Sequence, residues 1–142
     1  MKRILLVEDD ALFNKTLVYN LTSEGWHITS ALNANTAAIL LAQAEYDMVL
    51  LDINLPDGSG YDLCRLIKAE NPDTVVIFLT ANDDERGQIR GYDAGAVDYI
   101  TKPFSIRALL RKIRAMFTML DRREPSEDIY DDGKLFLNFP EQ

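Results

Sequence analysis

The sequence predicts an α/β fold: a doubly wound (βα)5 domain whose helices cover both faces of a parallel five-stranded sheet. Segments typical of strands and of helices alternate five times between residues 3 and 120. The strand segments are apolar throughout instead of alternating between apolar and polar residues, which is expected of parallel strands buried on both faces. These two observations favour a three-layer sandwich.

The strands are predicted from short apolar runs that end at polar or turn residues. The first begins at Arg3 and stops before three acidic residues, and the third runs into Asp52 shortly before Pro56. The fourth, Val-Val-Ile-Phe-Leu-Thr, consists of residues that favour strands. The second and fifth have weaker patterns. The predicted strands span residues 3–7, 27–32, 47–52, 75–80 and 97–101.

The helices are predicted from apolar residues at helical spacing and from residues that begin or end helices. Phe13, Leu17 and Leu21 recur every fourth position in the first helix. The second is rich in Ala and Leu, Pro72 follows the third, and the fourth is polar. Ser105 is a favourable N-cap for the last. The predicted helices span residues 10–24, 34–44, 60–70, 84–94 and about 105–120.

The composition is that of a globular protein, with 47% apolar and 27% charged residues among 142. No apolar run approaches the roughly 20 residues that span a bilayer, so no membrane association is expected. The single cysteine, Cys64, cannot form an internal disulfide, and a cytoplasmic location is expected. A net charge of −8 argues against nucleic-acid binding by this chain.

The charge balance changes near residue 120. Residues 1–120 carry 12 basic and 16 acidic side chains, and residues 121–142 carry 3 basic and 7 acidic ones, so each part has a net charge of −4. Residues 1–120 are therefore predicted as one domain, and residues 121–128 as a flexible linker.

Polar side chains stand where the predicted strands end. Glu8 and Asp9 follow the first strand, Asp52 ends the third, Thr80 ends the fourth and Lys102 follows the fifth. In doubly wound sheets the functional site lies outside the carboxyl ends of the strands, so these groups are expected to meet at one edge. Carboxylates this close repel one another unless a cation joins them.

A hard cation such as Mg²⁺ suits a ligand set made only of oxygen atoms, and no His or Cys at these strand ends supports zinc. The lone His27 falls elsewhere and is expected at the surface. With a metal present, the carboxylate of Asp52 can act as a nucleophile toward phosphorus and form an acyl phosphate. The ammonium of Lys102 and the hydroxyl of Thr80 would neutralise and orient the phosphoryl group.

Four segments together resemble the receiver domain of bacterial response regulators. They are Ile-Leu-Leu-Val-Glu-Asp-Asp, Leu-Asp-Ile-Asn-Leu-Pro-Asp-Gly-Ser-Gly, Phe-Leu-Thr-Ala and Asp-Tyr-Ile-Thr-Lys-Pro-Phe, in the family's order and spacing over residues 2 to about 120. The resemblance implies a flavodoxin-like sheet of strand order 2-1-3-4-5. It also implies that Asp52 accepts phosphate from a phosphohistidine of a sensor histidine kinase, as a switch and not as a turnover enzyme.

The resemblance further implies how the metal is held. Mg²⁺ (or Mn²⁺) would bind Asp9, Asp52 and the backbone carbonyl of Asn54, with Glu8 acting through water. Asp10 lies one place beyond the acidic pair and is expected to begin the helix that follows.

Other family roles fall on residues near the remaining strand ends. Thr80 matches the switch hydroxyl, Lys102 the phosphate-binding lysine, and Tyr99 the aromatic residue that turns inward on activation. The bond between Lys102 and Pro103 matches one that is cis in the family. Asn54 and Asn82 match two positions beside the path of the water that hydrolyses the acyl phosphate.

Residues 105–120 and the tail resemble the OmpR/PhoB (winged-helix) transcription factors. Residues 129–142 resemble the start of their DNA-binding domain, so promoter DNA is expected to be bound only by a missing C-terminal part. Their phosphorylated receivers pair as homodimers through the fourth helix, fifth strand and fifth helix. The charged residues expected on this dimer face are Asp93, Asp98, Arg111, Lys112 and Arg114. Gln88 and Ala108 occupy positions where the subfamily usually has a basic residue and Glu.

Simpler interpretations remain open for single residues and for the whole chain. Asp52 and Thr80 could cap the helices that follow them, Tyr99 could be an ordinary half-buried aromatic, and the charged face could be solvated. The alternative functions are a Mg²⁺-dependent phosphatase with an aspartyl nucleophile and a flavin-binding module. The first usually has a second Asp at position 54 and a cap domain, and the second needs a phosphate-binding loop where this chain has acidic residues.

Overall fold

The computed structural model describes residues 1–123 and confirms the predicted α/β architecture. Five parallel strands form one sheet, β1 (Arg3–Val7), β2 (His27–Ala31), β3 (Met48–Leu51), β6 (Val75–Thr80) and β7 (Asp98–Thr101). Their spatial order is β2-β1-β3-β6-β7. Because β4 (Asn54–Leu55) and β5 (Gly58–Ser59) form a separate hairpin, this is the predicted order 2-1-3-4-5 of the sheet strands.

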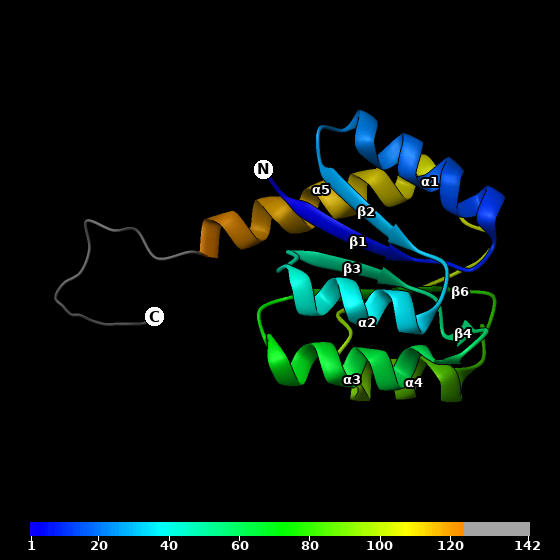
Figure 1. Cartoon of the computed structure of the whole chain (residues 1–142). Coiled ribbons are helices and arrows are strands. Elements are labelled where there is room, and N and C mark those ends of the chain that lie inside the picture. The colour runs from blue at the N-terminus through cyan, green and yellow to red at the C-terminus, as the bar shows by residue number, and fades with distance from the viewer. Residues whose placement is uncertain (124–142) are drawn as a thin grey trace, which may run out of the picture. The chain divides into compact units, whose positions relative to one another are not determined.

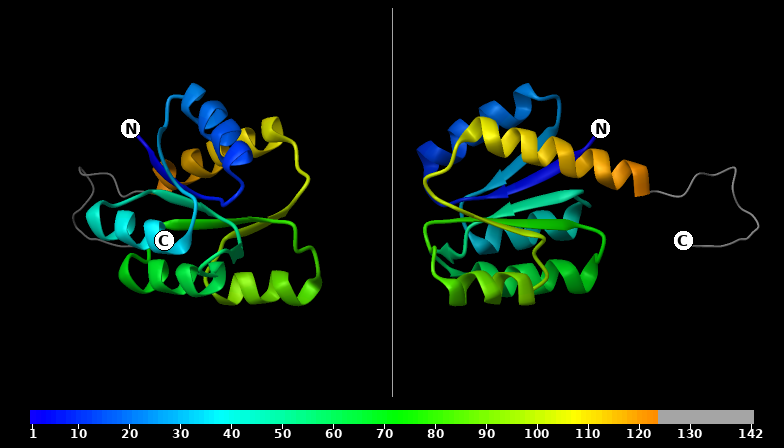
Figure 2. Two further views of the ribbon diagram at one scale, coloured as in Figure 1. Left: turned by 45° about the vertical axis from the view of Figure 1, so that its right-hand side comes forward. Right: turned by 180° about the vertical axis from the view of Figure 1, so that it is seen from behind.

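Residues 1–106 form one compact unit, and the described residues from Arg107 onward belong to a second. The first unit holds the sheet and four helices, α1 (Ala11–Ser23), α2 (Ala34–Gln43), α3 (Gly60–Glu70) and α4 (Glu85–Asp93). Figures 1 and 2 show α1 on one face of the sheet and α2, α3 and α4 on the other. The second unit begins with α5 (Ile106–Arg123), whose buried residues Leu109, Ile113 and Phe117 form one stripe.

The predicted element boundaries lie close to those observed, with two differences. The β4–β5 hairpin was not predicted, because two-residue strands leave no periodic pattern. Helix α5 begins after Ser105, as expected, but continues to Arg123, so residues 121–123 are helical and not linker. The rest of the predicted linker and the predicted start of a DNA-binding domain, residues 129–142, lie outside the described residues.

The core is formed where the central strands pair in register. Leu5 lies opposite Val49, and Val49 lies opposite Val76, and all three side chains are fully buried. Burial of each such side chain stabilises the fold by roughly 1.5–3 kcal/mol. The edge strand β2 is only partly buried, which explains its weaker apolar pattern, and His27 at its start is exposed as predicted.

The loop after β3 is held tightly against the strand end. Gly60 donates its N–H to the carbonyl of Ile53 at 2.7 Å. A Cβ atom at position 60 would lie 2.2 Å from the carbonyl oxygen of Asp52, so only glycine fits there. This close approach of the backbone is the reason for glycine at the turn.

The β4–β5 hairpin is also tied to helix α2. The carboxylate of Asp57 accepts hydrogen bonds from the backbone N–H groups of Ala34 (2.7 Å) and Asn35 (2.8 Å), the first residues of α2. These bonds hold the pKa of Asp57 below its ordinary value. The hairpin, and with it the loop that follows Asp52, is thereby fixed to a second element.

None of the helices in residues 1–123 has the length and apolar character needed to cross a membrane.

Replacing Asp57 with asparagine is expected to lower the urea midpoint of unfolding at pH 7, because the negative charge at the N-terminus of α2 is lost. The pKa of Asp57 is lowered in the fold, so its contribution is present above the unfolded-state pKa of about 3.9 and is lost as the pH falls through the folded-state pKa. The difference between wild type and Asp57→Asn should therefore shrink as the pH is lowered below the unfolded-state pKa.

Asp73→Asn is the matched control, since Asp73 is exposed on the loop before β6 and its replacement removes the same charge. We expect its midpoint at pH 7 to equal that of wild type. Equal midpoints for Asp57→Asn and wild type at pH 7 would contradict the capping role.

Candidate functional site

Three predicted acidic residues meet at the carboxyl ends of β1 and β3. Glu8, Asp9 and Asp52 each offer a carboxylate oxygen, and these oxygens lie within 4.8 Å of one another. Glu8 and Asp52 are 2% and 8% exposed, whereas Asp9 is exposed. Two buried carboxylates and one exposed carboxylate thus form a cluster that opens to solvent at Asp9, with a ligand set made of hard oxygen donors.

The predicted lysine bridges the two buried carboxylates. Lys102 Nζ lies 2.5 Å from Glu8 Oε1 and 3.1 Å from Asp52 Oδ2. Burial raises the pKa of Glu8 above its ordinary value, although the contact with Lys102 opposes this. Burial tends to lower the pKa of Lys102, but its bonds to Glu8 and Asp52 outweigh that effect and raise it. Lys102 is therefore charged at neutral pH.

Two further features orient Lys102. The peptide bond between Lys102 and Pro103 is cis, as the family resemblance implied. The ammonium lies 5.1 Å from the ring centroid of Phe13, and that ring contacts Phe104 edge-on at 5.7 Å. Phe13 was predicted only as part of the apolar stripe of the first helix, since sequence spacing cannot show which cation a ring faces.

Asp10 and Thr80, which could each cap the helix that follows, accept hydrogen bonds from nearby backbone N–H groups. Asp10 is the N-cap of α1 and accepts a hydrogen bond from the N–H of Phe13 at 3.1 Å, as expected. Thr80 is fully buried at the end of β6, and its Oγ1 accepts from the N–H of Asn82 at 3.3 Å. The N-cap of α4 is Asp84, so the interpretation of Thr80 as the cap of that helix is wrong.

Thr80 is joined to the lysine segment through the backbone. The N–H of Lys102 donates to the carbonyl oxygen of Thr80 at 2.8 Å, and Thr80 pairs with Thr101 in the sheet. Thr80 and Lys102 thus lie at the ends of the neighbouring strands β6 and β7, and Lys102 also contacts Asp52.

Tyr99 lies inward, beneath α4. It is 8% exposed, and its hydroxyl donates a 2.6 Å hydrogen bond to the carbonyl oxygen of Asn82. Its ring lies 6.0 Å from that of Phe78. Burial, followed by the nearby Tyr61, raises the pKa of Tyr99 well above its usual range, so the hydroxyl keeps its proton and remains a donor.

The two asparagines predicted beside the hydrolytic water line one cavity. Asn54 and Asn82 contribute to a hollow of about 410 Å³ that continues between the β4–β5 hairpin and the start of α4. The N–H of Asn54 approaches Asp52 Oδ1 at 3.4 Å. Asn54 thus adjoins Asp52 through its backbone, and Asn82 lines the same cavity.

Two further residues of this cavity, Tyr61 and Gly87, were not singled out from the sequence. The hydroxyl of Tyr61 donates to the carbonyl oxygen of Gly87 at 3.0 Å, and the guanidinium of Arg90 lies 4.4 Å from the Tyr61 ring centroid. Tyr61 and Gly87 were expected only as interior residues of two helices. Contacts between residues 26 positions apart leave no local signal.

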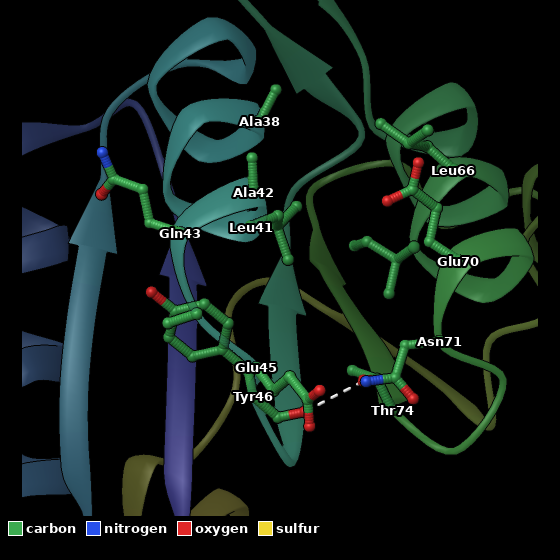
Figure 3. Close-up of a pocket in the computed structure, with 12 residues that line it drawn as sticks. Ala38, Leu41, Ala42, Gln43, Glu45, Tyr46, Leu66, Glu70, Asn71 and Thr74 are labelled. Carbon is green, nitrogen blue, oxygen red and sulfur yellow. Dashed lines mark hydrogen bonds between the residues drawn. The ribbon is translucent and has the colours of Figure 1, made fainter.

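A second cavity lies away from this cluster, between the C-terminal ends of α2 and α3 (Figure 3). Its volume is about 510 Å³, and Thr74 Oγ1 donates to the carbonyl of Tyr46 beside it at 2.9 Å. Glu45 and Glu70 are its acidic residues, and none of the residues predicted for the functional site lines it.

The residues predicted for a dimer face lie on α4, β7 and α5. Asp93 is exposed at the end of α4, and Asp98, which is half-buried, accepts a hydrogen bond from the N–H of Tyr99 at 2.7 Å. Arg111, Lys112 and Arg114 are exposed on α5. A pairing between copies remains a prediction.

Comparison with known proteins agrees with this geometry. Residues 4–114 match the family model of the response regulator receiver domain. A probable transcriptional regulatory protein of Mycobacterium tuberculosis, TcrX, is 38% identical over 113 residues, which cover 80% of this chain and 48% of that protein. The chain therefore spans about half the length of this curated relative.

Two solved structures from Thermotoga maritima have the same fold. The response regulator DrrB, an OmpR/PhoB homologue, is 35% identical with a TM-score of 0.74, over 94% of this chain and 58% of that chain. The response regulator TrrA, solved with Mg²⁺ and BeF, is 33% identical with a TM-score of 0.74, over 82% of this chain and 99% of that chain. With the acidic cluster and its lysine in place at the strand ends, this chain belongs to the response regulator receiver domains.

Proposed function

We propose that this chain is a phosphorylatable switch in a two-component pathway, in which Asp52 accepts a phosphoryl group from a phosphohistidine of a sensor histidine kinase in the cytoplasm. The observation that carries the proposal is the bridge from Lys102 to both Glu8 and Asp52. A carboxylate that is buried, in contact with an ammonium and next to further acidic groups is suited to react with phosphorus.

In the transfer, an oxygen of Asp52 forms a bond to phosphorus while the bond from phosphorus to the histidine nitrogen breaks. The ammonium of Lys102 moves from the carboxylate toward the charged phosphoryl oxygens, and the hydroxyl of Thr80 donates to another. Because little covalent chemistry is asked of the protein, orientation and charge neutralisation account for most of the rate. The product is an acyl phosphate on Asp52.

Mg²⁺ (or Mn²⁺) fits the residues present. Three carboxylates whose oxygens lie within 4.8 Å of one another repel one another, a bound cation relieves this repulsion, and all three are hard oxygen ligands. We propose that Asp9, Asp52 and the backbone carbonyl of Asn54 hold the ion, with Glu8 acting through water. When bound, the ion neutralises charge on the transferring phosphoryl group.

For the output we propose control of transcription by a longer protein of the OmpR/PhoB type, through a DNA-binding part that recognises promoter DNA. Phosphorylated copies would pair, with Asp93 and Asp98 of one copy facing Arg111, Lys112 and Arg114 of the other. Individual exposed ion pairs contribute little, so several are needed. Gln88 and Ala108 make this pairing differ from that usual in the subfamily.

Phosphorylation is expected on incubation with Mg²⁺ and acetyl phosphate, measured as a gain of one phosphoryl group in the intact mass. Asp52→Asn should abolish the gain because the nucleophile is removed, and a chelator should abolish it in wild type. Asp73→Asn, the exposed loop variant, should be labelled like wild type. An adduct that persists in Asp52→Asn would overturn the assignment, and sustained release of phosphate from an ester would indicate a phosphatase instead.

Metal binding is expected to depend on Asp9 and not on its neighbour Asp10. Asp9→Asn should weaken Mg²⁺ binding on the order of tenfold in calorimetry, because a charged ligand becomes a neutral one. Asp10→Asn makes the same charge change one residue away, and asparagine still caps α1, so the affinity should remain within about twofold of wild type. Equal losses in the two variants would show a general charge effect and no specific site.

The lifetime of the acyl phosphate is expected to lengthen in Asn54→Met, because an apolar side chain cannot orient the attacking water beside Asp52. The measurement is the decay of the phosphorylated mass after the donor is removed, and an apolar replacement of Asn82 should act in the same direction. Asn35→Met, an exposed change on α2, is the control and should leave the decay unchanged. The same decay rate in Asn54→Met and wild type would refute the role of this amide.

A further inference from the structure

Helix α4 has two glycines one turn apart, Gly87 and Gly91, and both are closely approached by side chains of neighbouring segments. A Cβ atom at Gly87 would lie 2.9 Å from Tyr99 Oη, 2.9 Å from Asp84 Oδ1 and 3.0 Å from Asn82 Nδ2. A Cβ atom at Gly91 would lie 2.9 Å from Tyr99 Cδ2 and 3.1 Å from Phe78 Cδ2. We call Gly87 and Gly91 the glycine slot, since the Tyr99 ring occupies the space that their side chains would need.

Backbone conformation does not explain these glycines. Among the described residues, the glycines with positive φ are Gly25 and Gly95, so Gly87 and Gly91 have a conformation open to any residue. Each glycine inside a helix lowers the helix-forming equilibrium about fivefold relative to alanine, and α4 has only nine residues. The space required by the neighbouring side chains is therefore the reason for glycine at these positions.

The two halves of the slot have different neighbours. Gly91 faces ring carbons, so it serves packing against Tyr99 and Phe78. Gly87 faces three polar atoms, and its own carbonyl accepts the hydrogen bond from Tyr61. One of these polar atoms is the Tyr99 hydroxyl oxygen, whose O–H donates a hydrogen bond to the carbonyl oxygen of Asn82. The N–H of Asn82 in turn donates to Thr80 Oγ1.

We propose that Gly87 is a positioning residue for the site: its missing side chain admits the phenol of Tyr99 beneath α4, and the phenol fixes the backbone of Asn82, whose N–H binds Thr80. Its effect on the acyl phosphate rests on the proposed function, whereas its effect on Tyr99 does not. Gly87 touches no reacting atom and acts through Tyr99.

The first test is a double-mutant cycle on unfolding by urea. Helix propensity alone would make Gly87→Ala raise the folding equilibrium constant about fivefold. We expect a decrease in the otherwise wild-type protein, because the new methyl group displaces the Tyr99 hydroxyl. In the Tyr99→Phe background, which lacks that oxygen, the effect of Gly87→Ala should be more favourable by about fivefold or more.

A second double-mutant cycle, with Asp84→Ser, distinguishes a clash with the Tyr99 phenol from a clash with the helix cap. Asp84 Oδ1 also approaches position 87 and accepts the N–H of Gly87 at 2.6 Å. If the loss of stability caused by Gly87→Ala becomes smaller in the Asp84→Ser background but not in the Tyr99→Phe background, the glycine is required by the helix cap and the proposal is wrong. It is equally wrong if Gly87→Ala stabilises the wild type, or if its effect is the same with Tyr and Phe at position 99.

The second test measures the decay of the acyl phosphate, which a purely structural role would not alter. Gly87→Ala should change the lifetime in the same direction as Tyr99→Phe, because both release Asn82, and should add nothing in the Tyr99→Phe background. An unchanged lifetime, or an equal change in both backgrounds, would overturn the role of the phenol. If the wild type accepts no phosphoryl group, the proposed function fails, while the unfolding cycle still decides whether Gly87 positions Tyr99.

Discussion

The ammonium of Lys102 between two buried carboxylates is the interaction on which the site depends. Glu8 and Asp52 come from the ends of β1 and β3, and two ionised acids at this depth would be strongly unfavourable without a partner. The lysine comes from the segment after β7, on the far side of β6. One cation thus joins three separate chain segments at the carboxyl ends of the strands.

A second chain of contacts leads from this site to the surface helix α4. The rings of Tyr61, Phe78 and Tyr99 follow one another at 5.5 and 6.0 Å. The two tyrosine hydroxyls bind the backbone of Gly87 and Asn82. Close packing of this kind leaves little room for one ring to shift without its neighbours. Tyr99 therefore connects Asn82, just beyond the end of β6, with α4.

The fold and most of the site could be predicted from the sequence, because both follow from local patterns and one topological rule. Apolar strands predict a parallel sheet, and the polar residues at their ends must then converge, which places Glu8, Asp52, Thr80 and Lys102 together. The roles of Asp57, Phe13 and Gly87 could not be predicted in this way. Each depends on a contact with a distant segment, where a carboxylate, a ring or an absent side chain fits a partner that sequence spacing does not reveal.

The depth of Asp52 limits which molecules can reach its carboxylate. Only 8% of the residue is exposed, Gly60 packs against its carbonyl, and the neighbouring Asp9 is exposed. A small molecule, or a group on a slender side chain, reaches a carboxylate at this depth more readily than a group that lies flat on a protein surface. If Asp52 accepts a phosphoryl group as proposed, its depth favours donors of that shape before any recognition of sequence or charge.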